Sequence, residues 1–185
     1  SGLGVNLTNG PMHTVRGRGL VQGVPQFVNM GLIDADVAAG VLRLWSTAGG
    51  TITNVGLMQA QHGATLDIAG ADALNPVFFN NAGGVLQALD GSVVNLSHAS
   101  LSGGLLGTLG SGVIRLPTSA TAIGSLVNIG SVEILGSTTL LPGTLTNHGN
   151  LRLGAGGIGA SLSVKDHVVL DGTGTLALSN SAANE

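Results

Sequence analysis

Carboxylates are the residues of this 185-residue chain whose type could support sugar chemistry, and there are nine of them. Glycoside cleavage needs two carboxylates that flank the scissile bond, or a basic residue beside a calcium cluster. Asp34 and Asp36 alone place two acids on one strand face, because residues two apart point the same way along a strand. We interpret the two residues as an exposed strand pair. A cation site is the alternative. The calcium-binding repeat GGxGxDx does not occur.

Other catalytic or metal-binding patterns are missing from the sequence. The five histidines show neither HxH nor HxxxH spacing, and no serine lies in a GxSxG elbow. The chain has no cysteine, which excludes disulfides and thiolate metal ligands. We therefore predict no catalytic residue, no metal and no cofactor. The chain is interpreted as a non-enzyme, with a polysaccharide lyase or hydrolase as the alternative.

Composition excludes several classes of protein. Six scattered Lys and Arg residues and a net charge of −3 give no electrostatic reason to expect a nucleic acid partner. No apolar run reaches the roughly 18–20 residues that cross a bilayer, so we expect no membrane insertion of this segment. With 43% hydrophobic residues and 32 glycines, the chain favours short strands joined by tight turns over disorder.

A corner sequence of the form apolar–x–Asn–x–Gly recurs along the chain. Its five copies carry Asn29, Asn54, Asn81, Asn128 and Asn147, and partial copies end at Asn9 and Asn180. The step from residue 81 to residue 128 is about twice the others, so a copy near residues 101–103 has lost its asparagine. Spacings of about 19–27 residues with three short strands predict an all-β fold, a parallel β-helix (β-solenoid) of about seven to eight coils.

The five asparagines should stack at one corner of the solenoid. There each amide can bind its own turn or the amide of the next coil, which satisfies buried polar groups. We interpret this asparagine ladder as structural. An asparagine-lined ligand groove is the alternative.

Strand faces follow from the alternation of side chains with a period of two. After the asparagine corner, five apolar residues align and should point inward: Ile33, Met58, Val85, Val132 and Leu151. An outward polar ladder is predicted as the candidate ligand face: Asp34, Arg43, Gln59, Asp67, Asn95, Arg115, Glu133 and Arg152. Opposite charges should be neighbours on adjacent coils at Arg43–Asp67 and at Glu133–Arg152. This face is either a solvated surface with matched charges or a glycan-binding strip.

An ice-binding surface would need a regular threonine array. Thr53 and Thr146 are expected to share one outward position, but Val28, Asn80 and Val127 fill that position in other copies. The array is therefore broken, and ice binding is disfavoured.

Boundaries can be placed from the repeat. Residues 1–24 are expected to form a degenerate first coil or a cap, residues 25–180 the β-helix repeats, and residues 181–185 a frayed tail. An inserted loop is expected at Asp72–Pro76 and a longer glycine-rich turn at Gly154–Gly159.

The repeated pieces TITNVGLMQA, FVNMGLIDAD and LTNHGNLRLG, followed by GATLDI or GVLRL, resemble the β-helical repeats of bacterial surface exoproteins. These are the filamentous-haemagglutinin-like adhesins of two-partner secretion and the passenger repeats of autotransporters. The resemblance covers roughly residues 20–180. It implies a right-handed helix and an extracellular or cell-surface location. It also implies neighbouring repeats of a longer parent chain. Neither a secretion-signal domain nor a membrane barrel is recognisable.

The function that the resemblance implies is adhesion, aggregation or biofilm formation by a non-enzymatic segment. Its partners would be a glycan, a host surface or a sister chain. The alternatives are a polysaccharide-active β-helix enzyme and a purely structural spacer.

Overall fold

Short strands separated by sharp corners build the chain, and Thr65–Ala69 shows why they form. Leu66 and Ile68 are fully buried on either side of Asp67, so the segment alternates between the core and the outer face. β-branched and apolar residues at every second position suit a pleated strand with one buried face. The computed structural model describes residues 6–46, 49–118, 121–157 and 159–179.

The strands form three parallel sheets, which we call sheets A, B and C, each with eight described strands. Sheet A contains β1 (Asn6–Asn9), β4 (Gln26–Asn29), β7 (Thr51–Asn54), β10 (Val77–Asn80), β13 (Ala99–Ser102), β16 (Thr121–Ile123), β19 (Ser137–Leu140) and β22 (Ser161–Val164). Sheet B contains β2 (Thr14–Arg16), β5 (Leu32–Ala35), β8 (Leu57–Ala60), β11 (Val85–Ala88), β14 (Leu105–Thr108), β17 (Leu126–Asn128), β20 (Gly143–Asn147) and β23 (Val168–Asp171). Sheet C contains β3 (Gly19–Gln22), β6 (Val41–Trp45), β9 (Thr65–Ala69), β12 (Val93–Ser97), β15 (Val113–Leu116), β18 (Ser131–Ile134), β21 (Asn150–Leu153) and β24 (Thr175–Leu178).

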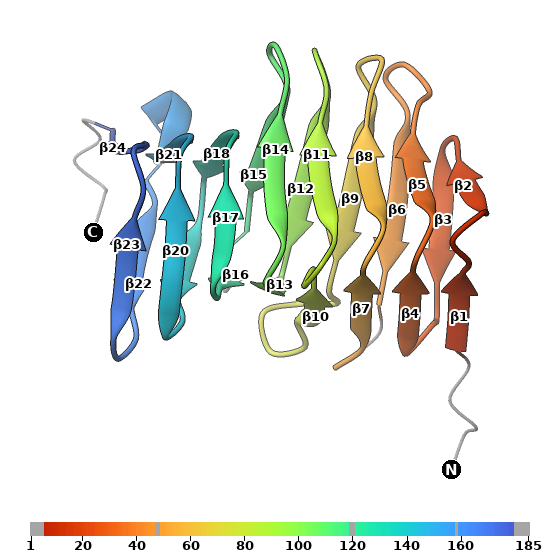
Figure 1. Cartoon of the computed structure of the whole chain (residues 1–185), viewed down its shortest axis with the longest axis horizontal. Helices are drawn as coiled ribbons and strands as arrows, with labels where there is room; N and C mark the ends of the chain where they lie inside the picture. The colour runs from red at the N-terminus through yellow and green to blue at the C-terminus, as the bar shows by residue number, and fades with distance from the viewer. Residues whose placement is uncertain (1–5, 47–48, 119–120, 158, 180–185) are drawn as a thin grey trace.

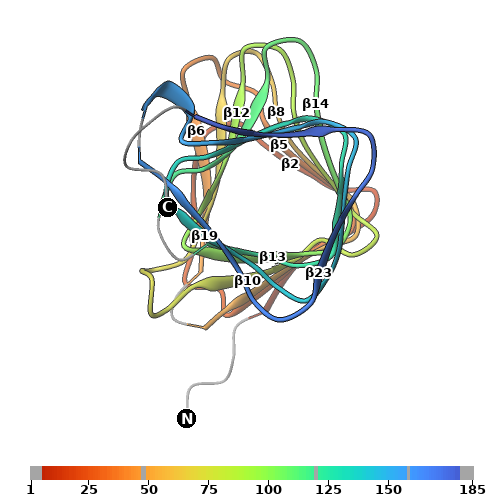
Figure 2. The ribbon, with the colours of Figure 1, turned by 90° about the vertical axis from the view of Figure 1, so that its left-hand side faces the viewer.

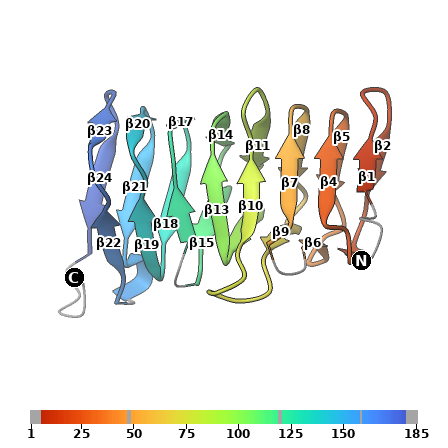
Figure 3. The same ribbon diagram turned by 90° about the horizontal axis from the view of Figure 1, so that it is seen from below.

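Successive strands enter sheets A, B and C in turn, so every three strands make one coil. Figure 1 shows the coils stacked in chain order from β1 to β24, and Figure 2 looks along the stack. From below, the strands of sheet A lie side by side in the same order (Figure 3). The predicted all-β parallel solenoid with three strands per coil is therefore confirmed. The described part of the 1–24 segment supplies β1 to β3, which pair with β4 to β6.

The core is a continuous column of inward side chains. Sheet C contributes a run of buried aliphatic residues, one from each of six consecutive coils: Leu42, Leu66, Val94, Ile114, Val132 and Leu151. Sheet B contributes Ile33, Met58, Leu86 and Leu106 in the same way. Burial of this apolar area, at about 25 cal/mol per Å², is the main favourable term in folding.

Two parts of the predicted inward alignment are wrong. Val85 pairs with Leu57 and is only half-buried, whereas Leu86 pairs with Met58 and is buried. The corner after Asn81 has one residue more than the corner after Asn54, and one extra residue exchanges the faces of a strand. Val132 and Leu151 do point inward, but they belong to sheet C and not to the sheet of Ile33 and Met58.

Two irregular segments interrupt the coils. The loop expected at Asp72–Pro76 lies between β9 and β10 and is closed by an antiparallel bridge between Asp72 and Asn75. The predicted glycine-rich turn contains η1 (Ala155–Gly157), which Figure 2 shows in blue, outside the outline of the stacked coils. Among the residues that the structure describes, no helical segment has the length and apolar character that crossing a bilayer requires. Asn180 and the predicted tail of residues 181–185 lie outside the described residues.

Candidate functional site

The asparagine ladder is present, and its first part lies at the corner between sheets A and B. The Nδ2 atom of each asparagine donates to the Oδ1 atom of the next one, from Asn9 to Asn29, Asn54 and Asn81, at 2.7 Å in all three steps. His13 continues the chain at its open end, because its Nδ1 atom lies 2.6 Å from Oδ1 of Asn9. His13 is not among the residues predicted from the sequence, because the turn conformation alone brings it to Asn9.

A second ladder lies at a different corner, which corrects the prediction of a single stack. Asn128 and Asn147 end strands of sheet B at the corner between sheets B and C, and Nδ2 of Asn128 donates to Oδ1 of Asn147 at 2.7 Å. The first ladder ends at Asn81 because Gly103 occupies the equivalent place after β13. A copy near residues 101–103 has thus lost its asparagine, as predicted. The next asparagine belongs to the other corner.

Every hydrogen-bonding group of a ladder asparagine can be engaged, and Asn54 illustrates this. Its Oδ1 atom accepts from Nδ2 of Asn29 and from the backbone N–H of Gly56, while its Nδ2 atom donates to Asn81 and to the carbonyl of Val85. The side chains of both ladders are buried. Because the amides bind one another inside the solenoid, this arrangement favours the structural interpretation over a ligand groove.

Six residues of the outward polar ladder form one column on the outer face of sheet C. They are Arg43, Asp67, Asn95, Arg115, Glu133 and Arg152, each the register partner of the next. Sequence reasoning could find this column because each residue lies between two buried apolar residues of its strand. We call it the sheet C strip.

Ion pairs hold the charged side chains of the sheet C strip in place. Nε of Arg43 lies 2.7 Å from Oδ2 of Asp67, and Nε of Arg115 lies 2.9 Å from Oε2 of Glu133. Nη1 of Arg152 approaches Oε1 of Glu133 to 3.7 Å. The predicted neighbours Arg43–Asp67 and Glu133–Arg152 are therefore adjacent. Asp67 is buried beneath Arg43 and also accepts from the hydroxyl of Ser97.

Asp34 and Gln59 lie on sheet B, away from the sheet C strip, and both are buried. Nε2 of Gln59 donates to Asp34 at 3.0 Å, Gln61 donates to the other oxygen of Asp34 at 2.7 Å, and Gln87 donates to Gln59 at 2.8 Å. Asp34 is 5% exposed and Gln59 is 9% exposed, so neither belongs to an open ligand face. The pairing of Gln61 with Asp34 involves residues 27 apart, which the sequence pattern does not reveal.

The predicted exposed pair of Asp34 and Asp36 is wrong. Asp36 follows the end of β5, and its side chain is 8% exposed. Its carboxylate accepts from Nε of Arg16 at 2.9 Å and also from Nη2 of Arg16. Each carboxylate is thus bound by different side chains. Among the described residues, no group of three or more His, Cys, Asp or Glu side chains could hold a metal ion.

Two aspartates in surface turns have pKa values below the ordinary value for the residue. Hydrogen bonds from the side chain of Asn75 and the backbone of Leu74 lower the pKa of Asp72. The backbone N–H and then the hydroxyl of Ser111 lower the pKa of Asp90. Both carboxylates are turn-forming groups, and their hydrogen bonds stabilise the ionised form.

Thr53 and Thr146 do not share an outward position. Thr53 lies on sheet A, where it pairs with Val28 and Asn80, and Thr146 lies on sheet B, where it pairs with Val127. The threonine array expected of an ice-binding face is therefore not only interrupted but divided between two sheets.

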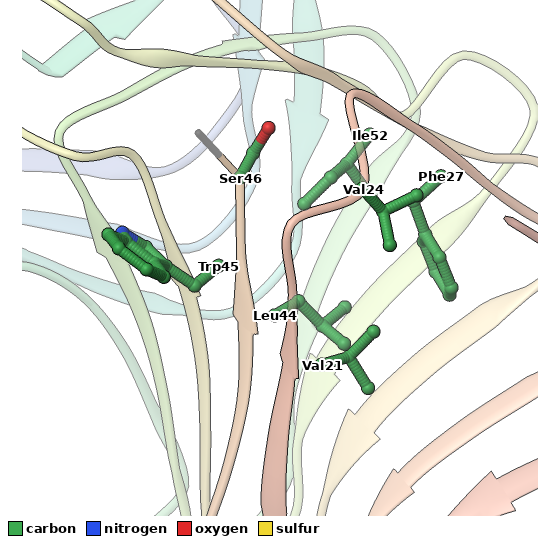
Figure 4. A pocket seen from close by; sticks show the side chains of 7 residues that line it. All are labelled: Val21, Val24, Phe27, Leu44, Trp45, Ser46 and Ile52. Carbon is green, nitrogen blue, oxygen red and sulfur yellow. The ribbon is translucent and has the colours of Figure 1, made fainter. Parts of the chain in front are cut away.

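Hollows in the structure lie at two places of interest. A small apolar cavity at the start of the solenoid is lined by Val21, Val24, Phe27, Leu44, Trp45, Ser46 and Ile52 (Figure 4). Its volume of about 10 Å³ leaves no room for a ligand larger than a water molecule. A shallow surface hollow on sheet C is lined by Arg115, Glu133, Leu135, Arg152, Ala155 and Gly156. The second hollow lies on the sheet C strip and is the better candidate binding site.

Comparisons with protein-family models, with curated proteins and with solved structures find no match.

Proposed function

We propose that this chain is a non-enzymatic segment of a secreted bacterial surface protein that acts in adhesion, aggregation or biofilm formation. The observation that carries the proposal is the sheet C strip, in which polar side chains from six consecutive coils form one column. Such a column presents regularly spaced groups, about 4.8 Å apart, on a rigid surface. A long partner such as a polysaccharide or another surface could contact several coils at once.

The arrangement of carboxylates supports a binding role more than a catalytic one. Sugar hydrolysis needs two carboxylates facing the same bond. Asp34 is bound by Gln59 and Gln61, whereas Asp36 is bound by Arg16. These interactions keep the two acids in separate environments. The location that goes with the proposal is extracellular or on the cell surface, with neighbouring coils of a longer parent chain.

A purely structural spacer is the second candidate function, and the ladders favour it. Two internal asparagine ladders and a continuous apolar core stiffen the solenoid whether or not its faces bind anything.

Adhesion assays separate these functions. The purified chain is coupled to beads and tested against mammalian and bacterial cells, beside a variant in which Arg43, Arg115 and Arg152 are all replaced by serine. We expect adhesion by the wild-type chain and its loss in the variant. Uniformly negative binding would favour the spacer. Cleavage of an acidic polysaccharide that is abolished by Asp34→Ala with Asp36→Ala would refute the proposal.

A further inference from the structure

The hollow at the C-terminal end of the sheet C strip is lined by charged side chains and by residues of a glycine-containing turn. Arg115 and Arg152 lie on β15 and β21, on either side of Glu133 on β18. The turn that contains η1 forms the wall beside them, with Ala155 and Gly156 lining the hollow. A neighbouring hollow is also lined by Arg152, Ala155 and Gly156, so the depression continues past Arg152 toward β24.

The two guanidinium groups keep most of their donors available. Arg115 donates to Glu133 through Nε, and Arg152 approaches the same carboxylate only to 3.7 Å. Among the described residues, no other hydrogen bond of either side chain is present. Both side chains are also exposed over about half of their surface, at 41% and 55%. A planar guanidinium with free N–H groups is suited to bidentate binding of a carboxylate.

Glu133 makes the hollow selective. Its side chain is only 15% exposed and is held by Arg115, so its position is defined. A carboxylate has about four acceptor sites, and the two arginines occupy only part of them. It can therefore accept hydrogen bonds from hydroxyl groups, while it repels anions that approach without donors. Two arginines against one glutamate leave a formal charge of +1 at the hollow.

The side of the hollow formed by Leu135 and the turn that contains η1 has space for a ring of a ligand. Leu135 supplies an apolar surface, and a Cβ atom placed on Gly156 would meet nothing within 4 Å. The ligand that fits these groups carries a carboxylate for the arginines, hydroxyls for Glu133 and an apolar ring face for Leu135.

We propose that this hollow binds a carboxylate-bearing saccharide, such as a uronate unit within an acidic polysaccharide. The inference rests on the proposed function in that it names the ligand class of the sheet C strip. Arg152 and Arg115 bind the sugar carboxylate, and Glu133 orients the sugar through its hydroxyls.

Isothermal titration of the purified chain with oligogalacturonate tests the proposal. The arms of the experiment are the methyl ester of the same oligosaccharide, dextran sulfate and neutral dextran. We expect binding of oligogalacturonate and loss of binding when the carboxylates are esterified. Arg152→Gln removes charge-assisted hydrogen bonds to the sugar carboxylate, so it should weaken the affinity for oligogalacturonate at least about tenfold. Arg152→Lys should also weaken it, because an ammonium group cannot form the bidentate contact.

Arg18→Gln is the matched control, because it removes one exposed positive charge far from the hollow. It should leave the affinity for oligogalacturonate unchanged. Circular dichroism establishes that each variant is folded. If Arg152→Gln does not fold, Arg115→Gln and Arg152→Lys carry the test. Equal binding of the ester or of dextran sulfate, or equal affinity of wild type and Arg152→Gln, would overturn the proposal.

Failure of the ligand class and failure of the proposed function give different results. Adhesion that persists without any binding of oligogalacturonate overturns the ligand class and leaves the adhesive function standing. Binding of oligogalacturonate with no adhesion to any cell supports the ligand class and contradicts the adhesive function.

Discussion

Replacing Asn54 with alanine removes the third member of the first asparagine ladder and should destabilise the protein strongly. The side chain is fully buried and takes part in four hydrogen bonds: with Asn29, with Asn81, with the Gly56 N–H and with the Val85 carbonyl. At about 1 kcal/mol of net stability for each bond, the loss amounts to about 4 kcal/mol. That is a large part of the roughly 5–15 kcal/mol that stabilises a typical domain.

The substitution also leaves a buried acceptor without its donor. Among the described residues, Nδ2 of Asn54 is the one donor to Oδ1 of Asn81, and alanine cannot replace it. The carbonyl of Val85 likewise loses a donor. An orphaned buried acceptor such as Oδ1 of Asn81 costs about 1–3 kcal/mol, so 4 kcal/mol is a conservative expectation.

Urea denaturation followed by far-ultraviolet circular dichroism measures the loss as a change in the free energy of unfolding. The matched control is Asn80→Ala, one residue before the last member of the same ladder. Asn80 is exposed, and its side chain accepts one hydrogen bond, from the N–H of Ala82, so its loss should cost about 1 kcal/mol or less. If Asn54→Ala costs no more than Asn80→Ala, the ladder does not stabilise the solenoid and the reasoning is refuted.

Three further predictions test other parts of the structure. Thr138 is buried in sheet A, and within the described chain its hydroxyl has no hydrogen-bond partner. Thr138→Val should therefore raise the free energy of unfolding, measured by urea denaturation, by about 1 kcal/mol. A decrease in the free energy of unfolding would contradict this. Gly104 has a φ of +71°, and a Cβ there would lie 2.1 Å from a backbone oxygen of the preceding coil, so Gly104→Ala should lower the free energy of unfolding by about 3 kcal/mol. Gly83 also has a positive φ but open space around it, so the control Gly83→Ala should lower the same quantity by about 1 kcal/mol. Equal losses would show that the close approach at Gly104 is relieved. Hydrogen bonds from Ser111 lower the pKa of Asp90 below 3.8, so Asp90 contributes stability above about pH 3.8 that is lost as the pH falls through its native pKa. In Ser111→Ala the pKa should rise but stay below 3.8, because the backbone N–H of residue 111 remains, and carboxyl NMR titration measures it; an unchanged pKa would exclude the hydroxyl as a cause.

The sheet C strip was predictable because its information is local. In each of its strands, a polar residue stands between two apolar ones, as in Leu42-Arg43-Leu44 and Leu66-Asp67-Ile68. Alternation with a period of two assigns the middle residue to the outer face without reference to the rest of the chain. Adjacent copies of the same short strand then become neighbours in the sheet.

The partners of Asp34 were not predictable in the same way. Its two amide donors, Gln59 and Gln61, come from the next coil, and they bury a carboxylate that the strand pattern places outside. Nothing in the alternation of β5 indicates how closely the neighbouring side chains cover it. His13, which binds the end of the first ladder, depends on its turn conformation in a similar way.

The sequence by itself determined that the chain is a parallel solenoid, that asparagines mark its corners and that the third strand of each coil carries the polar residues of the outer face. These features depend on side-chain alternation and turn chemistry, which act over a few residues. Only the tertiary structure decided which corner each asparagine occupies. Asn81 and Asn128 share one corner sequence, yet one follows sheet A and the other ends a strand of sheet B. The physical reason is that the lengths of all the intervening turns together decide which corner an asparagine reaches. Whether two asparagines occupy the same corner therefore depends on the whole stack of coils.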